Sequence, residues 1–189
     1  MPTKPKIDRE QILEAAFQLV REQGHEALRV RPLAARLGCS TQPVLYQFAT
    51  VEELRRETYR RADAFHTAYL LAGLEESGEP LLELGLRYIR FAAEEKPLFR
   101  FLFQTDAFAG RSLEELIAAP EAAPLLALTA RESGKAEGEA QVMFRTLFAC
   151  VHGYASLLAN NAMDFDPAAA EASLLALYRG LLNAQEEEK

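Results

Sequence analysis

The sequence has no tryptophan, only two cysteines and no long uninterrupted apolar run. Cys39 and Cys150 stand in different halves of the chain and form no Cys-x-x-Cys pair, which excludes a disulfide framework and predicts two free thiols in a reducing cytoplasm. No apolar run approaches the ~18 residues that a membrane span requires. The first residues, MPTKPKIDRE, also lack the apolar segment of a secretory signal. The sequence therefore predicts a cytoplasmic protein with no membrane partner.

Signatures of catalysis and of metal binding are equally scarce. The three histidines, His25, His66 and His152, show no ligand spacing with one another or with the cysteines. A glycine-rich phosphate loop, a GxSxG nucleophile elbow and an HExxH motif are absent. We therefore expect no metal, no cofactor and no enzymatic activity.

What the chain does contain is an ordinary globular composition with an uneven charge. The 189 residues are 49% hydrophobic and 26% charged, which is enough apolar material for a core in one or two domains. Residues 1–61 carry 11 Lys and Arg and 8 Asp and Glu, hence a net charge of +3, whereas residues 62–189 carry 10 and 20, hence −10. A basic segment before an acidic body indicates that only the first part meets a polyanion.

Helix signals begin close to the start of the chain. Asp8 with Gln11 has the spacing of a capping box, and Gly24 supplies the stop of the first helix. A second, short helix ends at Gly38, and Ser40 is expected to cap a third. The second and third helices, joined by a tight turn, match a helix-turn-helix, which lays its second helix in the major groove of DNA; the alternative is a plain helical hairpin. The helices expected here cover residues 8–24, 30–37, 40–48 and 50–72.

The remainder of the chain is also expected to be helical. Thr50 with Glu53 and Ser112 with Glu115 repeat the capping-box spacing, and short linkers between apolar runs predict a compact bundle. The sequence thus predicts an all-α protein of about nine helices. The later helices are expected at residues 80–94, 97–104, 112–132, 138–161 and 167–185.

Residues 30–54 read VRPLAARLGCSTQPVLYQFATVEEL and closely resemble the DNA-binding signature of the tetracycline-repressor (TetR) family. The match runs without gaps from a helix through a Leu-Gly turn into the recognition helix and the start of the next helix. The resemblance implies a helix-turn-helix DNA-binding domain at residues 1–50, a connecting helix at 51–72, and a ligand-binding and dimerisation domain at 73–189. The segment FACVHG, which begins at Phe148, is also similar to a subgroup of these C-terminal domains named for a Trp-His-Gly motif.

Three positions depart from the family pattern. Leu45 stands where tyrosine is usual, Gln47 where histidine is usual, and Val51 where the family has a lysine that contacts a phosphate. Arg55 or Arg56, one turn further along, could substitute for that lysine.

Chemistry and the resemblance agree on the DNA contacts. Thr41 and Gln42 lie at the N-terminal turn of the expected recognition helix, which is the end that reaches base edges. Glutamine pairs bidentately with adenine, and threonine offers a hydroxyl or a methyl group. Tyr46 has the reach for a phosphate, and Arg31 matches a position that contacts DNA in the family. The predicted DNA-binding residues are Arg31, Thr41, Gln42, Pro43, Leu45, Tyr46, Gln47 and Arg55.

Aromatic and polar side chains in the second part of the chain are the candidates for an effector site. Ligand pockets are mostly apolar with a few polar groups, although most aromatic residues at helical spacing belong to a core. The predicted pocket residues are Arg87, Tyr88, Phe91, Phe101, Gln104, Phe144, Phe148 and His152.

The last two expected helices carry apolar residues on more than one side, which predicts burial on more than one side. In TetR-like proteins the two C-terminal helices pair with those of a second subunit in a four-helix bundle, so the resemblance implies a homodimer. The predicted interface residues are Val151, Tyr154, Leu158, Leu174, Leu177, Tyr178 and Leu181.

These observations predict a ligand-responsive DNA-binding transcriptional regulator, a repressor that a small-molecule effector releases from operator DNA. Two other classes stay open: a helix-turn-helix adaptor that acts through protein partners, and an all-α enzyme. Native-gel shifts with a salt titration would separate the three classes. A repressor should show a preference for particular DNA sequences, the adaptor should show none, and an enzyme should not bind DNA.

Overall fold

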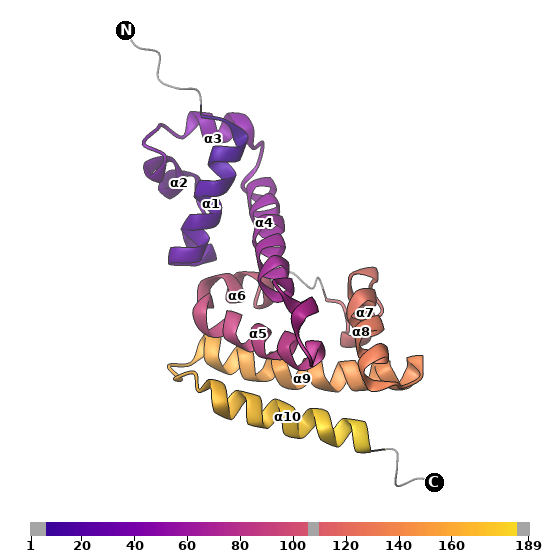
Figure 1. Ribbon diagram of the computed structural model, residues 1–189. Coiled ribbons are helices and arrows are strands. Elements are labelled where there is room, and N and C mark those ends of the chain that lie inside the picture. The colour runs from indigo at the N-terminus through magenta and orange to yellow at the C-terminus, as the bar shows by residue number, and fades with distance from the viewer. Residues whose placement is uncertain (1–6, 106–109, 185–189) are drawn as a thin grey trace. The chain divides into compact units, whose positions relative to one another are not determined.

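The computed structural model describes residues 7–105 and 110–184, and this part of the chain is helical without a β-strand. The fold is therefore all-α, as predicted. The predicted lack of a secretory signal rests on the first residues of the sequence, of which residues 1–6 lie outside the described part. The ten α-helices are α1 (Arg9–Gln23), α2 (Val30–Arg36), α3 (Gln42–Gln47), α4 (Val51–Leu71), α5 (Pro80–Glu94), α6 (Lys96–Phe103), α7 (Leu113–Ile117), α8 (Ala123–Ser133), α9 (Glu137–Asn160) and α10 (Pro167–Asn183) (Figure 1).

The helices form two compact units. The N-terminal unit comprises the described part of Met1–Thr67 together with Glu95–Thr105, and the C-terminal unit comprises Ala68–Glu94 with the described part of Asp106–Lys189. Helix α6 therefore packs with the N-terminal unit, although it follows α5 of the other unit in sequence. These units are defined by packing, and the functional division at residues 50 and 72 stays a prediction.

Local signals explain how the N-terminal unit begins. The Asp8 carboxylate accepts a hydrogen bond from the Gln11 backbone N–H at 2.8 Å, and the Gln11 side chain accepts from the Asp8 N–H at 3.0 Å, which is the predicted capping box. Gly24 ends α1 with a φ of 85°, and Gly38 forms the turn after α2 with a φ of 64°, a region that favours glycine. Buried Leu33 from α2 contributes to the core of the unit.

The start of α3 differs from the expectation. Ser40 was the expected cap, but α3 begins at Gln42, and Thr41 is its N-cap without a side-chain capping bond. Pro43 lies in the first helical turn, where a missing N–H costs nothing because those groups lack intrahelical partners. The six-residue helix is fixed by buried Val44 and by Phe48 just beyond its end.

Helix α6 is attached to α1 by an ion pair. The Arg21 guanidinium donates to both oxygens of Glu95, the residue before α6, with a distance of 2.8 Å from Nε to Oε2. The Arg21 Cζ also lies 5.1 Å from the ring centroid of Phe65 on α4. The Glu95 carboxylate is largely shielded from solvent. Its hydrogen bond with the Arg21 guanidinium raises the pKa of Arg21.

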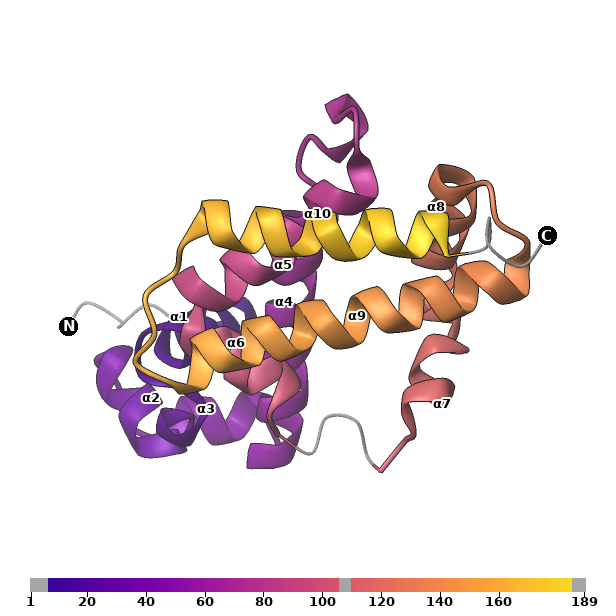
Figure 2. The same cartoon turned by 90° about the horizontal axis from the view of Figure 1, so that it is seen from below.

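The C-terminal unit is built around α5, which packs against α9 and α10. Figure 2 shows α9 and α10 running side by side. A side chain at Gly85 of α5 would place its Cβ 2.7 Å from Leu174 Cδ2 of α10 and 3.4 Å from Val151 Cγ2 of α9. Glycine at this position therefore allows the close approach of three helices.

The helix predicted at residues 112–132 is interrupted. The predicted capping box of Ser112 and Glu115 is present, but α7 ends at Ile117 and α8 begins only at Ala123. Pro120 disfavours helical backbone in the preceding residue, and it opens a 3-10 turn between the two helices. This break accounts for ten α-helices where about nine were expected.

Helix α9 meets the length and composition of a membrane span, the one helix in the described part of the chain that does so. It packs against α5, α8 and α10, so we attribute its apolar side chains to the packing of the C-terminal unit.

Burial of His66 on α4 predicts acid sensitivity. Its side chain is 7% exposed, its ring packs edge-on against Phe103 at 5.2 Å, and burial lowers its pKa to about 4. As the pH falls below 6.5, His66 takes up a proton in the unfolded chain but stays neutral in the folded chain until about pH 4. The free energy of unfolding should therefore fall by up to about 3 kcal/mol between pH 6.5 and 4.

Urea unfolding at pH 7.5, 6 and 5 measures this loss. His66→Gln should remove most of it and His25→Gln should keep it; equal losses in both would contradict the assignment.

Candidate nucleic-acid interface and effector site

Helix α3 presents large side chains to solvent. Tyr46 is 79% exposed and Leu45 is 53% exposed, and Gln42 in the first turn is exposed as well. Thr41, Pro43 and Gln47 are half-buried. An exposed tyrosine next to an exposed leucine leaves apolar side-chain surface on α3 available for contact with a partner. The structure thus brings six of the eight predicted DNA-binding residues together on or beside α3.

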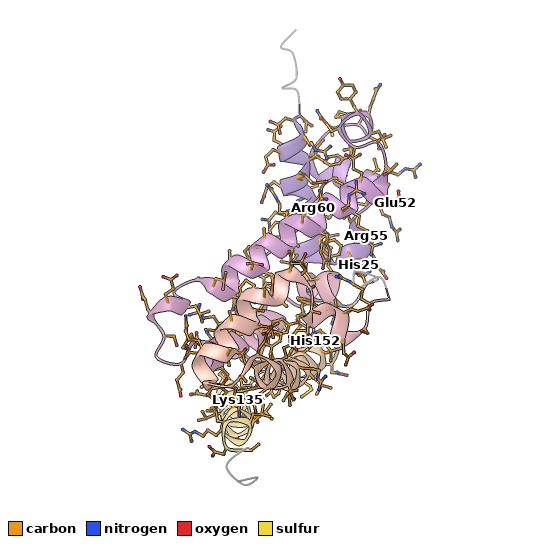
Figure 3. All side chains as sticks on the ribbon, turned by 90° about the vertical axis from the view of Figure 1, so that its right-hand side faces the viewer. His25, Glu52, Arg55, Arg60, Lys135 and His152 are labelled. Carbon is orange, nitrogen blue, oxygen red and sulfur yellow. The ribbon has the colours of Figure 1, made fainter. Side chains whose placement is uncertain are left out.

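The other two predicted residues are arginines on neighbouring helices. Arg31 lies in the first turn of α2, and Arg55 follows Glu52 on α4 (Figure 3). Both are exposed, as is Arg29, which the sequence reasoning did not single out. These three arginines form no ion pair with any of the described residues. Their guanidinium groups can therefore meet phosphates, which supply most protein–DNA hydrogen bonds.

A cluster at the end of α3 was not foreseen. The Arg9 side chain on α1 donates to the Gln47 carbonyl at 2.5 Å and to Glu53 Oε1 at 2.9 Å, and its Cζ lies 4.1 Å from the Phe48 ring centroid. Glu53 Oε2 accepts from the Ala49 N–H at 2.9 Å. These donors lower the pKa of Glu53, the Ala49 N–H first and then Arg9.

This cluster also modifies the second predicted capping box. The Glu53 N–H donates to the Thr50 hydroxyl at 3.0 Å, as expected, but the Glu53 carboxylate binds Ala49 and Arg9. Arg9 and Glu53 are 44 residues apart, so sequence spacing gave no signal for their contact.

Four of the predicted pocket residues form one aromatic cluster in the C-terminal unit. Phe144, Phe148 and His152 follow each other at four-residue spacing on α9, with ring centroids 6.2 and 5.5 Å apart. The Tyr88 hydroxyl from α5 is hydrogen-bonded to His152 Nδ1 at 2.8 Å. Burial lowers the pKa of His152, which favours a neutral imidazole at pH 7.

The other four predicted pocket residues lie elsewhere. Arg87 binds Glu83 and the Leu70 and Ala72 carbonyls. Phe91 is fully buried against Tyr69. The remaining two, Phe101 and Gln104, belong to the N-terminal unit, where the Phe101 ring packs with His25 and Tyr59.

A shallow groove between α8 and α9 escaped the sequence reasoning. Its volume is about 290 Å³, near the lower limit of ligand pockets. Its lining is apolar except for Glu137, and alanine-rich stretches give no sequence signal for a site. The lining residues are Ala123, Leu126, Ala127, Ala130, Glu137 and Ala140.

Most of the predicted dimer residues face their own chain. Val151, Leu158, Leu174 and Tyr178 are buried within one subunit, and Tyr154, Leu177 and Leu181 are half-buried. The apolar residues of α10 thus form one broad face that packs against α5 and α9, not two faces as the sequence suggested.

The outer face of α9 is different. Val142, Cys150, Gly153 and Leu157 lie on this exposed stripe, and the opposite side of the helix supplies the core. The exposed side of α10 carries alanines and Gly180 together with the charged residues Glu171 and Arg179. Small and apolar side chains are therefore available to a partner on both helices.

Metal binding has no geometric basis here. Across residues 7–105 and 110–184, no group of three His, Cys, Asp or Glu side chains could hold a metal ion.

A helix-turn-helix whose second helix is exposed, joined in one chain to a separate helical unit, defines the class of helical DNA-binding regulators. Within this class, residues 81–181 match the family described as "Tetracyclin repressor-like, C-terminal domain". The match covers more than half of the chain, which therefore belongs to the tetracycline-repressor-like family, whose members are transcriptional regulators and not enzymes. No curated protein matches the chain.

Solved structures share the fold. One is a glutamine-to-alanine variant of TetR from Acinetobacter baumannii AYE in complex with minocycline; it is 21% identical, with 96% of this chain and 98% of that chain covered and a TM-score of 0.57. Another is a TetR transcriptional regulator from Rhodococcus sp. RHA1, 16% identical, with 92% and 96% covered and a TM-score of 0.52. At these identities the likeness concerns the fold.

The contacts of Arg87 predict a structural role instead of a ligand contact. Arg87→Met leaves the Leu70 and Ala72 carbonyls at the end of α4 without this donor, and should lower the free energy of unfolding by about 1–3 kcal/mol. Urea unfolding measures the loss. Arg90→Met, an exposed arginine on the same helix, is the control and should stay within about 0.5 kcal/mol of the parent. Equal stabilities of the two variants would contradict this role.

Proposed function

We propose that this chain is a dimeric transcriptional repressor that reads operator DNA through α3 and leaves the operator when a small-molecule effector binds the C-terminal unit. The observation that carries the proposal is the exposure of Gln42, Leu45 and Tyr46 on a helix held in a helix-turn-helix. Family membership supports transcriptional regulation, and repression with effector release is the finer part of the proposal. The cytoplasm is where such a protein would meet its DNA.

Exposed arginines support the DNA contact despite the net charge of −7. Arg31 and Arg55 are exposed on the helices that precede and follow α3 and can bind phosphates. Thr41 and Gln42 stand at the N-terminal end of α3, the end that in a helix-turn-helix reaches base edges. Selection of bound sequences from a random DNA pool would define the operator.

Two substitutions on α3 should separate base reading from phosphate binding. Gln42→Ala should cost about 1–3 kcal/mol at one position of the selected site, whereas Tyr46→Phe should weaken all sequences alike. Fluorescence anisotropy measures the DNA affinity of both variants across salt concentrations. The logarithm of the binding constant should fall with the logarithm of the salt concentration with a slope of about −0.9 for each phosphate neutralised. A parent slope near zero would refute DNA binding, and unchanged operator affinity in Gln42→Ala would refute its role as a reader.

The aromatic cluster supports an effector site in the C-terminal unit. Phe144, Phe148 and His152 offer stacked rings, and the Tyr88–His152 hydrogen bond supplies a polar group among them. The similar structure from Acinetobacter baumannii AYE is of a TetR variant in complex with minocycline. We infer that the effector of this chain is a small, largely apolar molecule that shifts the population away from the DNA-binding conformation.

Dimerisation is proposed through the outer faces of α9 and α10. Gly153 and Gly180 lie inside these helices, and a Cβ at either position would meet nothing within 4 Å in its own chain. Glycine inside a helix costs about 1 kcal/mol relative to alanine, so its presence is explained when a second chain approaches closely there. A two-fold dimer would also set two recognition helices one turn of DNA apart, or a multiple of it.

The proposed interface predicts different effects for two equally exposed leucines. Leu157, 53% exposed on the outer face of α9, should contact the partner, whereas Leu71, 50% exposed at the end of α4, should not. Leu157→Glu should therefore yield monomers and weaken operator binding, while Leu71→Glu should sediment at twice the 21.1 kDa of one chain, like the parent. A monomeric parent, or a Leu157→Glu dimer, would overturn the interface.

A further inference from the structure

A side-chain hydrogen bond from α1 holds the recognition helix at its C-terminal end. Helix α3 has six residues, and helices of this length are unstable in isolation. Its first turn, which carries Thr41 and Gln42, has no side-chain capping bond. Its last turn, in contrast, is contacted by a side chain from α1 and is followed by a segment bound to α4. The orientation of the reading end therefore depends on how firmly the other end is held.

One ion pair joins the three helices at that end. Arg9 of α1 binds the Gln47 carbonyl and covers the Phe48 ring, and it pairs with Glu53 of α4, which holds the Ala49 N–H. We call this arrangement the Arg9–Glu53 clamp. Through one guanidinium and one carboxylate it contacts three consecutive residues, at the Gln47 carbonyl, the Phe48 ring and the Ala49 N–H.

Other ion pairs of the N-terminal unit do not reach α3. Arg61 pairs with Glu10 and Glu14 and joins α4 to α1, and Arg36 pairs with Glu22 and joins α2 to α1. The clamp differs because both of its members also bind backbone groups of the segment that ends α3. A forked guanidinium is suited to holding a carboxylate and a carbonyl at once, which a lysine cannot do in the same geometry.

We propose that Arg9 and Glu53 are positioning residues for sequence reading: the clamp sets the direction in which α3 presents Gln42 and Tyr46 to DNA. This inference rests on the proposed DNA-binding function and extends it to two residues that are not themselves base readers. Loss of the clamp lets α3 reorient, which removes base contacts but leaves the phosphate contacts of exposed arginines in place.

Glu53→Ala tests the clamp because two effects of the substitution on operator affinity have opposite signs: the loss of negative charge should raise the affinity, and the loss of the clamp should lower it. Removal of an acidic side chain near DNA should by charge alone strengthen binding to every sequence. Glu52→Ala makes the same change at the neighbouring exposed position and measures that effect (Figure 3). The clamp predicts that Glu53→Ala loses about tenfold in the ratio of operator to random-sequence affinity relative to Glu52→Ala, the size expected for a misplaced base contact.

Arg9→Lys provides a second variant, which keeps the positive charge and loses the fork. Its affinity for random DNA should fall no further than that of Tyr46→Phe, and its ratio of operator to random-sequence affinity should fall as in Glu53→Ala. Amide hydrogen exchange should quicken over residues 42–49 in both variants and stay at the parent rate in α1 and α6. This localised change separates loss of positioning from general loss of stability.

Each outcome of these measurements decides the inference. If the parent discriminates operator from random DNA and Glu53→Ala behaves like Glu52→Ala, the clamp is overturned and the proposed function stands. If the parent does not discriminate operator from random DNA, the clamp and the proposed function are both overturned. Circular dichroism monitors folding, and loss of helix in both variants would also overturn the clamp, because the pair would then hold the whole unit and not α3.

Discussion

The six-residue length of α3 is the constraint on which the DNA-binding half of this protein depends. Too few hydrogen bonds form inside such a helix to offset the entropy of ordering it, so its shape is imposed by its surroundings. Val44 and Phe48 bury one side in the core shared with α1, and Arg9 and Glu53 hold its last turn. The exposed side is then available for the residues that, by our proposal, contact DNA.

Glycine marks two kinds of helix contact in the C-terminal unit. Gly85 lies where a Cβ would come within 2.7 Å of the end of the Leu174 side chain, so a larger residue would make that side chain shift. A Cβ at Gly153 or Gly180 would meet nothing of its own chain within 4 Å, and our proposal places a second chain there. The inner and outer faces of α9 thus follow the same rule of close packing, one within the subunit and the other, by our proposal, between subunits.

Short-range signals in the sequence were sufficient for most of the fold. The capping box at Asp8 follows from spacing, and the range of α5 agrees with the expected residues 80–94 because a proline opens it and another follows its end. At Pro120 the proline overrides an apolar periodicity that continues on both sides, so periodicity alone predicted one helix there. The place of α6 in the N-terminal unit arises from contacts between distant residues such as Arg21 and Glu95, which no local pattern encodes.

Contacts between residues far apart in the sequence also limited what could be predicted of the site, and the arginines of the N-terminal unit are an example. The recognition helix could be located because its residues are contiguous, but the sequence could not tell which arginines remain available. Of those in the N-terminal unit, Arg9, Arg36 and Arg61 are engaged by glutamates, whereas Arg31 and Arg55 form no ion pair with the described residues. Pairing within the unit therefore neutralises Arg9, Arg36 and Arg61 and leaves Arg31 and Arg55 exposed on the helices before and after α3. An acidic chain can then bind a polyanion, because the local arrangement of cations and not the net charge determines the field that DNA meets.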